Sequence, residues 1–336
     1  MPAAADSTKP FASPYGTGTR ADIILVTTDG VQLYVHQQFV SMMSPVLSRT
    51  FSGADSLDLP LGDQLPKYTV PTNAATMVGF LRYCYPTGVV PVADDALDDI
   101  HSIHALALDL EAYKVIDLIK TLLQERVTRD AYRVFALSCL LLLPDIAKAA
   151  ARQTLHHLFL YNHRDYASVA EFAVLPASNL IALSAYRAKC VQAITRCLGV
   201  HRSAEVGDPG DRERVDGLPW WSDAYGPHSD SCGTRLVSHP DPTAPECYKP
   251  TPWFSKLLDH AQASASVTPT TDAVAAALCD YTYIWGDVIQ CEVCSKQAGS
   301  PLRALADSLC KDVEKQIDMV TREHVFLDYT RSKSTV

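Results

Sequence analysis

The segment at 21–51 constrains the fold most, because it holds two strand-like patterns and two helical patterns in immediate succession. Its runs at 21–27 and 31–35 are apolar or alternating and rich in β-branched residues, as strands are. Asp29-Gly30 between the runs predicts a two-residue hairpin turn, since both residues tolerate positive φ. Ser44, which precedes a proline, predicts the N-cap of the second of two short helices. We therefore expect a β-hairpin followed by a helix pair.

The residues up to 126 continue this mixture of strand-like and helix-like patterns. The run at 67–70 predicts a third strand, and Asn73 is placed to cap the helix that follows it. Apolar residues at helical spacing then predict two more helices, over 96–110 and around 115–123. The predicted architecture is a small sheet covered by helices, which is an α+β fold, followed by an all-α region.

Composition divides the chain of 336 residues into segments. The first is dominated by Ala, Pro, Ser, Thr and Gly, which predicts a disordered tail. Eight of the 21 prolines fall in the stretch at 201–252, a density that cannot sustain long helices and predicts a linker or irregular loop. The predicted segments are a tail at 1–19, the α+β domain at 20–126, a helical region at 127–200, the Pro/Gly-rich loop at 201–252 and a C-terminal helical region at 253–330.

The α+β segment resembles the BTB/POZ domain. The resemblance spans roughly a third of the chain and joins a hairpin, a histidine, a helix junction and a later aromatic helix in the order that this family has. The residues that carry it are Asp22, Asp29-Gly30, Val35-His36, Phe39-Val40, Ser44-Pro45-Val46 and Phe51, and then Phe80-Leu81-Arg82-Tyr83-Cys84-Tyr85 with Thr87-Gly88.

The helical region resembles the one that follows BTB in many fungal BTB proteins, and it is analogous to the BACK domain of other BTB adaptors. The matching stretches are 133–137, 147–155 and Tyr186-Arg187 with Cys190. The resemblance therefore implies a BTB/POZ fold with a BACK-like helical extension.

The resemblance implies a protein–protein interaction module and not an enzyme. BTB domains typically dimerise through the first strand and first helices, so the candidate interaction residues there are Asp22, His36, Phe39, Val40 and Met43. Many members recruit a cullin as ubiquitin-ligase adaptors, and others regulate transcription. We expect a homodimer that acts as a scaffold or adaptor, with a cullin or another protein as its partner.

Two departures from the family bear on these alternatives. Cullin-recruiting members usually carry an apolar residue, any residue and an acid soon after the second helix, whereas the nearest fit here, Leu61-Gly62-Asp63, comes several residues late. Dimeric transcriptional members tend to place a basic residue after the histidine, and this chain has Gln37 there. Adaptor and free-standing scaffold both stay open.

His36 stands at the predicted end of a strand, beside an apolar helix. An imidazole titrates near neutral pH and could carry protons. No nucleophile or second base lies near it in sequence, so the favoured interpretation is a buried, hydrogen-bonded side chain that holds the hairpin to the helices. The sequence holds no phosphate-loop, dinucleotide-binding, hydrolase or kinase motif, and we expect neither catalysis nor a small-molecule substrate.

A candidate zinc site lies near the C-terminus and consists of Cys279, Cys291, Cys294 and Cys310. The middle two have the spacing at which two thiolates share a tetrahedral metal. Further candidate ligands in the Pro/Gly-rich loop are Cys232, Cys247, His228 and His239. The favoured interpretation is reduced, buried thiols that behave as small hydrophobes, with no metal and no cofactor. The alternative is a zinc-stabilised transcriptional or signalling regulator.

Trp220, Trp221 and Trp253 stand in or beside the Pro/Gly-rich loop. Exposed aromatic side chains in a loop often mark a partner site, which makes these three candidate interaction residues. The alternative is that they fold back onto the helices and anchor the loop.

Charge and hydropathy argue against two classes of partner. Lys and Arg number 29 against 38 Asp and Glu, a formal net charge of −9, and duplex binding needs clustered cations. The longest apolar stretch, at 134–143, is shorter than the roughly 20 residues of a membrane helix. The residues at 1–19 lack the apolar run of a signal peptide. We expect an intracellular protein, cytoplasmic or nuclear, with no nucleic-acid or membrane partner.

Overall fold

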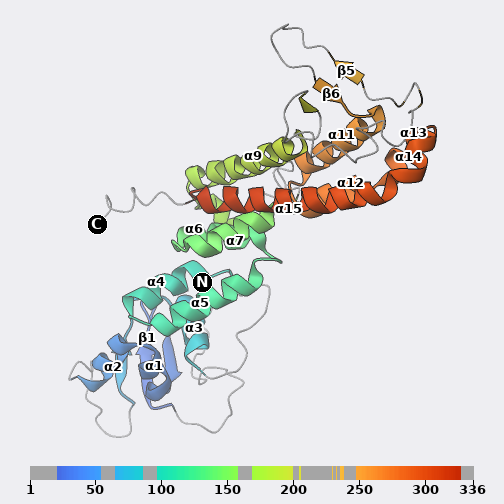
Figure 1. The fold of residues 1–336 in the computed structure, drawn as a ribbon. Helices are drawn as coiled ribbons and strands as arrows, with labels where there is room; N and C mark the ends of the chain where they lie inside the picture. Colours follow the sequence, from blue (N-terminus) through green and yellow to red (C-terminus); the bar gives the residue numbers. More distant parts are fainter. Residues whose placement is uncertain are drawn as a thin grey trace, which may run out of the picture. The chain divides into compact units, whose positions relative to one another are not determined.

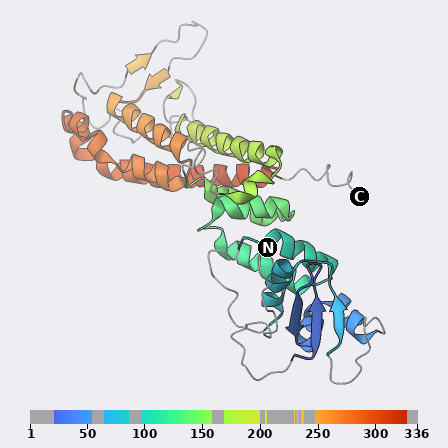
Figure 2. The same ribbon diagram turned by 180° about the vertical axis from the view of Figure 1, so that it is seen from behind.

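The computed structural model describes residues 21–53, 65–85, 97–157, 169–199, 204–205, 229, 232, 235–237 and 247–326. They form two compact units (Figure 1, Figure 2). The first comprises the described residues up to Asp130 together with Leu140–Ile146. The second comprises Ala131–Cys139 and the described residues from Ala147 onward. The tail predicted at 1–19 lies outside the described residues.

The first unit contains a sheet with the strand order β2-β1-β3. Strands β1 (Ile23–Val26) and β2 (Gln32–Val35) are antiparallel, and β3 (Lys67–Thr69) runs parallel to β1. The first three side chains of β1 are buried, because this strand is central. The predicted hairpin and third strand are therefore both present.

The hairpin turn differs from the predicted two-residue form. Val26 pairs with Gln32, and Thr27 closes a further hydrogen bond to Val31, so that three residues form the loop. Among the residues of this hairpin loop, only Gly30 has a positive φ, of 78°. Asp29 instead uses its carboxylate as an acceptor, from the Thr27 hydroxyl at 2.5 Å and from the backbone N–H of Ala74 at 3.1 Å. These hydrogen bonds, that to Thr27 first, lower the pKa of Asp29.

Helices surround this sheet, and their starts follow the predicted caps. Ser44 Oγ accepts the backbone N–H of Leu47 at 3.1 Å, and Asn73 Oδ1 accepts that of Thr76 at 2.9 Å. The predicted α+β fold is thereby confirmed. The helices of this unit within the described residues are α1 (Gln37–Met43), α2 (Pro45–Ser52), α3 (Ala74–Cys84), α4 (Ile100–Asp109) and α5 (Tyr113–Arg126).

The second unit is dominated by helices. The long helices α9 (Ala177–Gly199) and α15 (Gly299–Glu323) pack side by side, and α11 (Pro252–Val267) packs on α9 and on α12 (Thr271–Leu278). The core holds the fully buried side chains of Trp253, Phe254 and Tyr186. The other helices here are α6 (Ala131–Leu140), α7 (Pro144–Thr154), α13 (Trp285–Val288) and α14 (Glu292–Gln297), the first two with a few residues in the first unit.

Short strands also lie in the stretch at 201–252, where the sequence predicted only a loop. They are β4 (Ala204–Glu205), β5 (Arg235–Val237) and β6 (Cys247–Lys249), and they form an antiparallel sheet of order β4-β6-β5. Prolines and glycines exclude long helices from this stretch, but they leave room for strands of two or three residues.

Candidate interaction surface and cysteine cluster

His36 joins the hairpin to the end of α3. Its backbone N–H donates to Tyr85 Oη at 3.0 Å, and its Nδ1 lies 3.3 Å from the same oxygen. The imidazole also makes edge contacts with the rings of Phe39 and Tyr85. Burial raises the pKa of Tyr85, so this phenol stays a neutral hydrogen-bonding group. The arrangement matches the structural interpretation of His36, since it joins distant segments without a nucleophile among its described partners.

Asp22 supports the start of α1 beside this histidine. Its Oδ1 accepts the backbone N–H of Gln37 at 2.6 Å, which satisfies one of the otherwise unpaired amides at the helix start. The carboxylate itself stays exposed. Asp22 therefore fixes Gln37, and Tyr85 fixes His36, so two successive residues at the start of α1 are held in place. The Asp22 side chain also faces outward.

The apolar residues of α1 point in different directions. Val40 is fully buried, and Phe39 and Met43 are half-buried, so these three predicted interaction residues contribute largely to the core. Met42 is 61% exposed and was not predicted from the sequence. The available signal was that Val40 and Met43 occupy the inner side of a helix, which leaves an apolar Met42 on the outer side without an internal role.

A surface concavity surrounds Met42. Its lining consists of Asp22, Gln37, Gln38, Ser41, Met42 and Ser48. The lining holds one carboxylate, several neutral polar groups and one large apolar side chain, with no Lys or Arg. The concavity is thus an amphipathic surface on α1 and its neighbours, and we refer to these six residues as the α1 surface.

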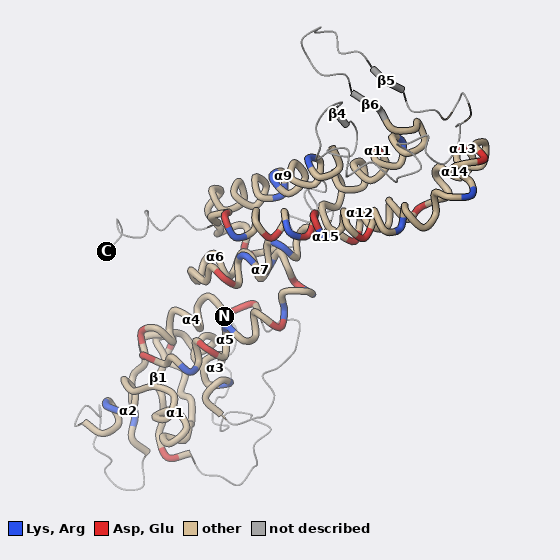
Figure 3. Tube along the Cα trace, in the orientation of Figure 1, with Lys and Arg blue, Asp and Glu red and all other residues tan. Residues whose placement is uncertain are grey.

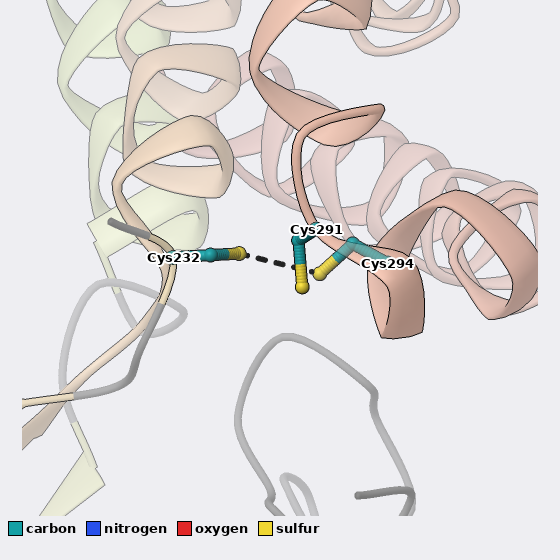
Figure 4. A group of neighbouring side chains, drawn as sticks. All are labelled: Cys232, Cys291 and Cys294. Atoms are coloured by element: carbon teal, nitrogen blue, oxygen red, sulfur yellow. Dashed lines mark hydrogen bonds between the residues drawn. The ribbon is translucent and has the colours of Figure 1, made fainter. Parts of the chain in front are cut away.

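Three cysteines from distant parts of the chain meet in the second unit. Figure 4 shows the side chains of Cys232, Cys291 and Cys294 converging. Their sulfur atoms all lie within 4.8 Å of one another, and Sγ of Cys232 is 3.5 Å from that of Cys294. All three are buried, and no disulfide joins the described cysteines.

The four cysteines of the predicted zinc site separate into two groups. Cys291 and Cys294 lie together and are joined by Cys232, one of the further ligand candidates from the loop. Cys279 is exposed, and Cys310, half-buried, is its electrostatic neighbour, so neither belongs to the group around Cys291. The sequence could not show which of Cys232, Cys279 and Cys310 joins Cys291 and Cys294. That choice depends on the tertiary structure, because none of the three is a near neighbour of the pair in sequence.

Trp253 is fully buried beside these cysteines. Its indole Nε1–H donates to Cys294 Sγ at 3.4 Å, and its ring packs against Phe254. It therefore anchors α11 inside the unit, as in the alternative interpretation of the loop tryptophans. Trp220 and Trp221 lie outside the described residues, as does Leu61-Gly62-Asp63, the nearest fit to a cullin-binding motif.

Burial affects the acidity of the thiols in this cluster. Burial raises the pKa of Cys232 and of Cys294, with the neighbouring thiols adding to the effect at Cys232. A reactive cysteine needs the opposite shift, caused by a nearby cation or helix terminus. With raised pKa values, the metal-free thiols of Cys232 and Cys294 are poor nucleophiles.

The hairpin and the helix pair give the first unit an α+β fold with an outward-facing α1 surface. Residues 13–126 match the family model of the BTB/POZ domain. These residues are therefore a BTB/POZ domain, which is a protein–protein interaction module, and a largely helical region follows them. A search of curated proteins finds no match to the chain. The BACK-like character of the helical region stays a prediction.

The charge and the hydropathy of the described helices concern nucleic-acid and membrane partners. Acidic and basic residues alternate along α15, which carries no continuous basic stripe (Figure 3). Within the described residues, no helix combines the length and the apolar character needed to cross a membrane.

Proposed function

We propose that this chain is a homodimeric scaffold whose BTB/POZ unit pairs with a second copy through the α1 surface. BTB/POZ domains are protein–protein interaction modules, and members of the family typically dimerise through the first strand and first helices. The α1 surface lies on those elements, between Asp22 before β1 and Ser48 in α2.

The exposed side chain of Met42 is the observation that carries this proposal. Methionine adapts its shape to a partner, and interface cores are enriched in Met and depleted of charge. The α1 surface has this composition in part, since Met42 lies among neutral polar residues and one carboxylate, that of Asp22. In a twofold dimer the same surface contributes from both subunits, and a twofold axis that passes through this concavity brings Met42 close to its own symmetry copy.

The second unit offers a separate surface for another protein, which supports the scaffold role. Tyr283, Trp285 and Ile289 are all exposed near α13. Trp285 also lines a pocket, with Tyr281 and Ile284 among its other apolar residues. A homodimer would present two copies of this surface, and paired binding sites increase avidity for a multivalent partner.

Sedimentation equilibrium of the full chain and of its Met42→Glu variant tests the dimer. The wild type should sediment as a dimer at micromolar concentration. The substitution places like charges opposite each other across the twofold axis, so the dissociation constant of the dimer should rise by about tenfold or more. Because Met42 is exposed, the variant should keep the thermal transition of the folded monomer.

Ile181→Glu is the matched control, since Ile181 is a 69% exposed apolar residue on α9 of the second unit. This variant should stay dimeric. A monomeric wild type would overturn the proposal. Dissociation by Ile181→Glu with no effect of Met42→Glu would equally overturn it, because the dimer would then form through the helical unit.

A further inference from the structure

We infer that Cys232, Cys291 and Cys294 are thiolate ligands of a structural zinc ion in the second unit. Around tetrahedral zinc, Zn–S bonds of about 2.3 Å place neighbouring sulfur atoms about 3.8 Å apart. The three sulfur atoms here lie within 4.8 Å of one another, and the pair Cys232–Cys294 is at 3.5 Å. The cluster therefore has the dimensions of a zinc–thiolate site without a rearrangement of the backbone.

The sequence distance between the ligands gives the site a structural role. Cys291 is the N-cap residue of α14, and Cys294 lies in its first turn, which brings the two thiols to one side of the chain. Cys232 comes from the stretch between β4 and β5, far earlier in the sequence. A metal bound to all three would tie that stretch to the helical bundle, as zinc does in small domains with little core of their own.

The surroundings of the sulfur atoms also fit a metal site. The indole N–H of Trp253 donates to Cys294 Sγ at 3.4 Å, and hydrogen bonds of this kind orient metal ligands and stabilise the thiolate. All three cysteines are at most 4% exposed, so water does not compete for the ligands. A disulfide between Cys232 and Cys294 would use two of the sulfur atoms and leave the sulfur of Cys291, within 4.8 Å of both, without a role.

The chemistry of binding balances with protons alone. Zn²⁺ displaces one proton from each of the three thiols, giving three Zn–S bonds and three released protons, and no electron is transferred. A tetrahedral ion then has one further position.

Metal analysis of the full chain, purified without chelator, tests the inference directly. We expect about one zinc per chain in the wild type. Cys232→Ser, Cys291→Ser and Cys294→Ser should each lose the metal, whereas Cys279→Ser and Cys310→Ser, the matched controls, should retain it.

Cobalt substitution of the wild type keeps the test valid where a serine variant fails to fold. Co²⁺ bound by three thiolates gives sulfur-to-metal charge-transfer absorption and the intense visible bands of a tetrahedral site. Trp253→Phe should weaken metal affinity by about tenfold, because it removes the N–H donor to Cys294. The inference is overturned if the wild type holds less than half an equivalent of zinc after incubation with the metal. Loss of zinc in Cys279→Ser would also overturn it, as would a mass lower by two hydrogen atoms, which indicates a disulfide.

The zinc inference is independent of the dimer proposed above. Met42→Glu should leave the zinc content unchanged, and Cys291→Ser should leave the sedimenting species unchanged. Each hypothesis can therefore be rejected by its own experiment, and the other hypothesis then still stands.

Discussion

Ser44 links three elements of the BTB/POZ domain through one hydroxyl. Its oxygen accepts the N–H of Leu47 at the start of α2, and its hydrogen is donated to the carbonyl of Leu110 at the end of α4, at 2.7 Å. The side chain is fully buried, so neither partner can turn to water when the hydroxyl is removed. The residue is at once a helix cap and a tertiary contact.

Replacement of Ser44 by alanine should lower the free energy of unfolding by about 1–3 kcal/mol, since a cap is lost and a buried carbonyl loses its donor. Urea denaturation followed by circular dichroism measures this change. Ser52→Ala is the control, because Ser52 is exposed and bonds only within its own helix, and it should stay within about 0.5 kcal/mol of the wild type. Equal losses in the two variants would show that the bond to Leu110 contributes nothing.

For single residues, the sequence predicts the roles that depend on residues close by in the chain. The cap functions of Ser44 and Asn73 follow from the residues that come next in the chain, and both are confirmed. The bond from Ser44 to Leu110 crosses 66 residues, and no local pattern encodes it. The exposure of Met42 was open to prediction from helical spacing, but Asp29 as a partner of Ala74 was not, because it depends on where α3 returns.

The end of α15 is attached to α9 through the segment at 324–326. His324 Nε2 lies 2.9 Å from the carbonyl oxygen of Ala182, and the amide of Asn179 donates to the carbonyl of Phe326 at 2.9 Å. The rings of His324 and Phe326 also pack against Tyr186. A histidine thus forms part of the apolar joint between the two elements.

This joint should weaken in acid. Burial, with smaller contributions from Lys189 and Lys148, lowers the pKa of His324, although its bond to Ala182 acts in the opposite direction. A histidine whose pKa is lower when folded stabilises the fold at high pH, and that stability is lost as the pH falls below the unfolded value of about 6.5. The melting temperature of the wild type should therefore fall between pH 7.5 and pH 5.5.

His324→Asn should reduce this pH dependence, because the amide does not titrate. His157, whose pKa is also lowered by burial, should leave part of it in place. An unchanged pH profile for His324→Asn would contradict the assignment to this joint.

Prediction from sequence is uneven at the scale of elements. The helices and the first sheet follow from periodicity and caps, and the pair Cys291–Cys294 is visible as a spacing. The convergence of Cys232 on that pair was not predictable, since it depends on the path of a stretch rich in proline and glycine. The short strands β4, β5 and β6 were missed because two or three residues carry too little alternation to be recognised.

At the scale of the whole molecule, the division into two compact units predicts two cooperative blocks. Ser44 probes the first unit. Arg187 of α9 probes the second, where its buried guanidinium donates to the backbone carbonyls of Thr154 at 3.4 Å and His157 at 3.3 Å, and also to that of Val267. These carbonyls belong to the ends of α7 and α11, so Arg187 joins the C-termini of two helices to a third.

Hydrogen exchange measured by mass spectrometry distinguishes two blocks from one, because it reports on each peptide separately. Ser44→Ala should increase exchange in peptides within 21–126 and leave those within 177–326 unchanged. Arg187→Met, which keeps the apolar stem but removes the hydrogen bonds to three backbone carbonyls, should have the reverse effect. A rise in exchange throughout the chain in either variant would mean that the two units unfold together. The helical region would then be an extension of the BTB/POZ core and not a second cooperative unit.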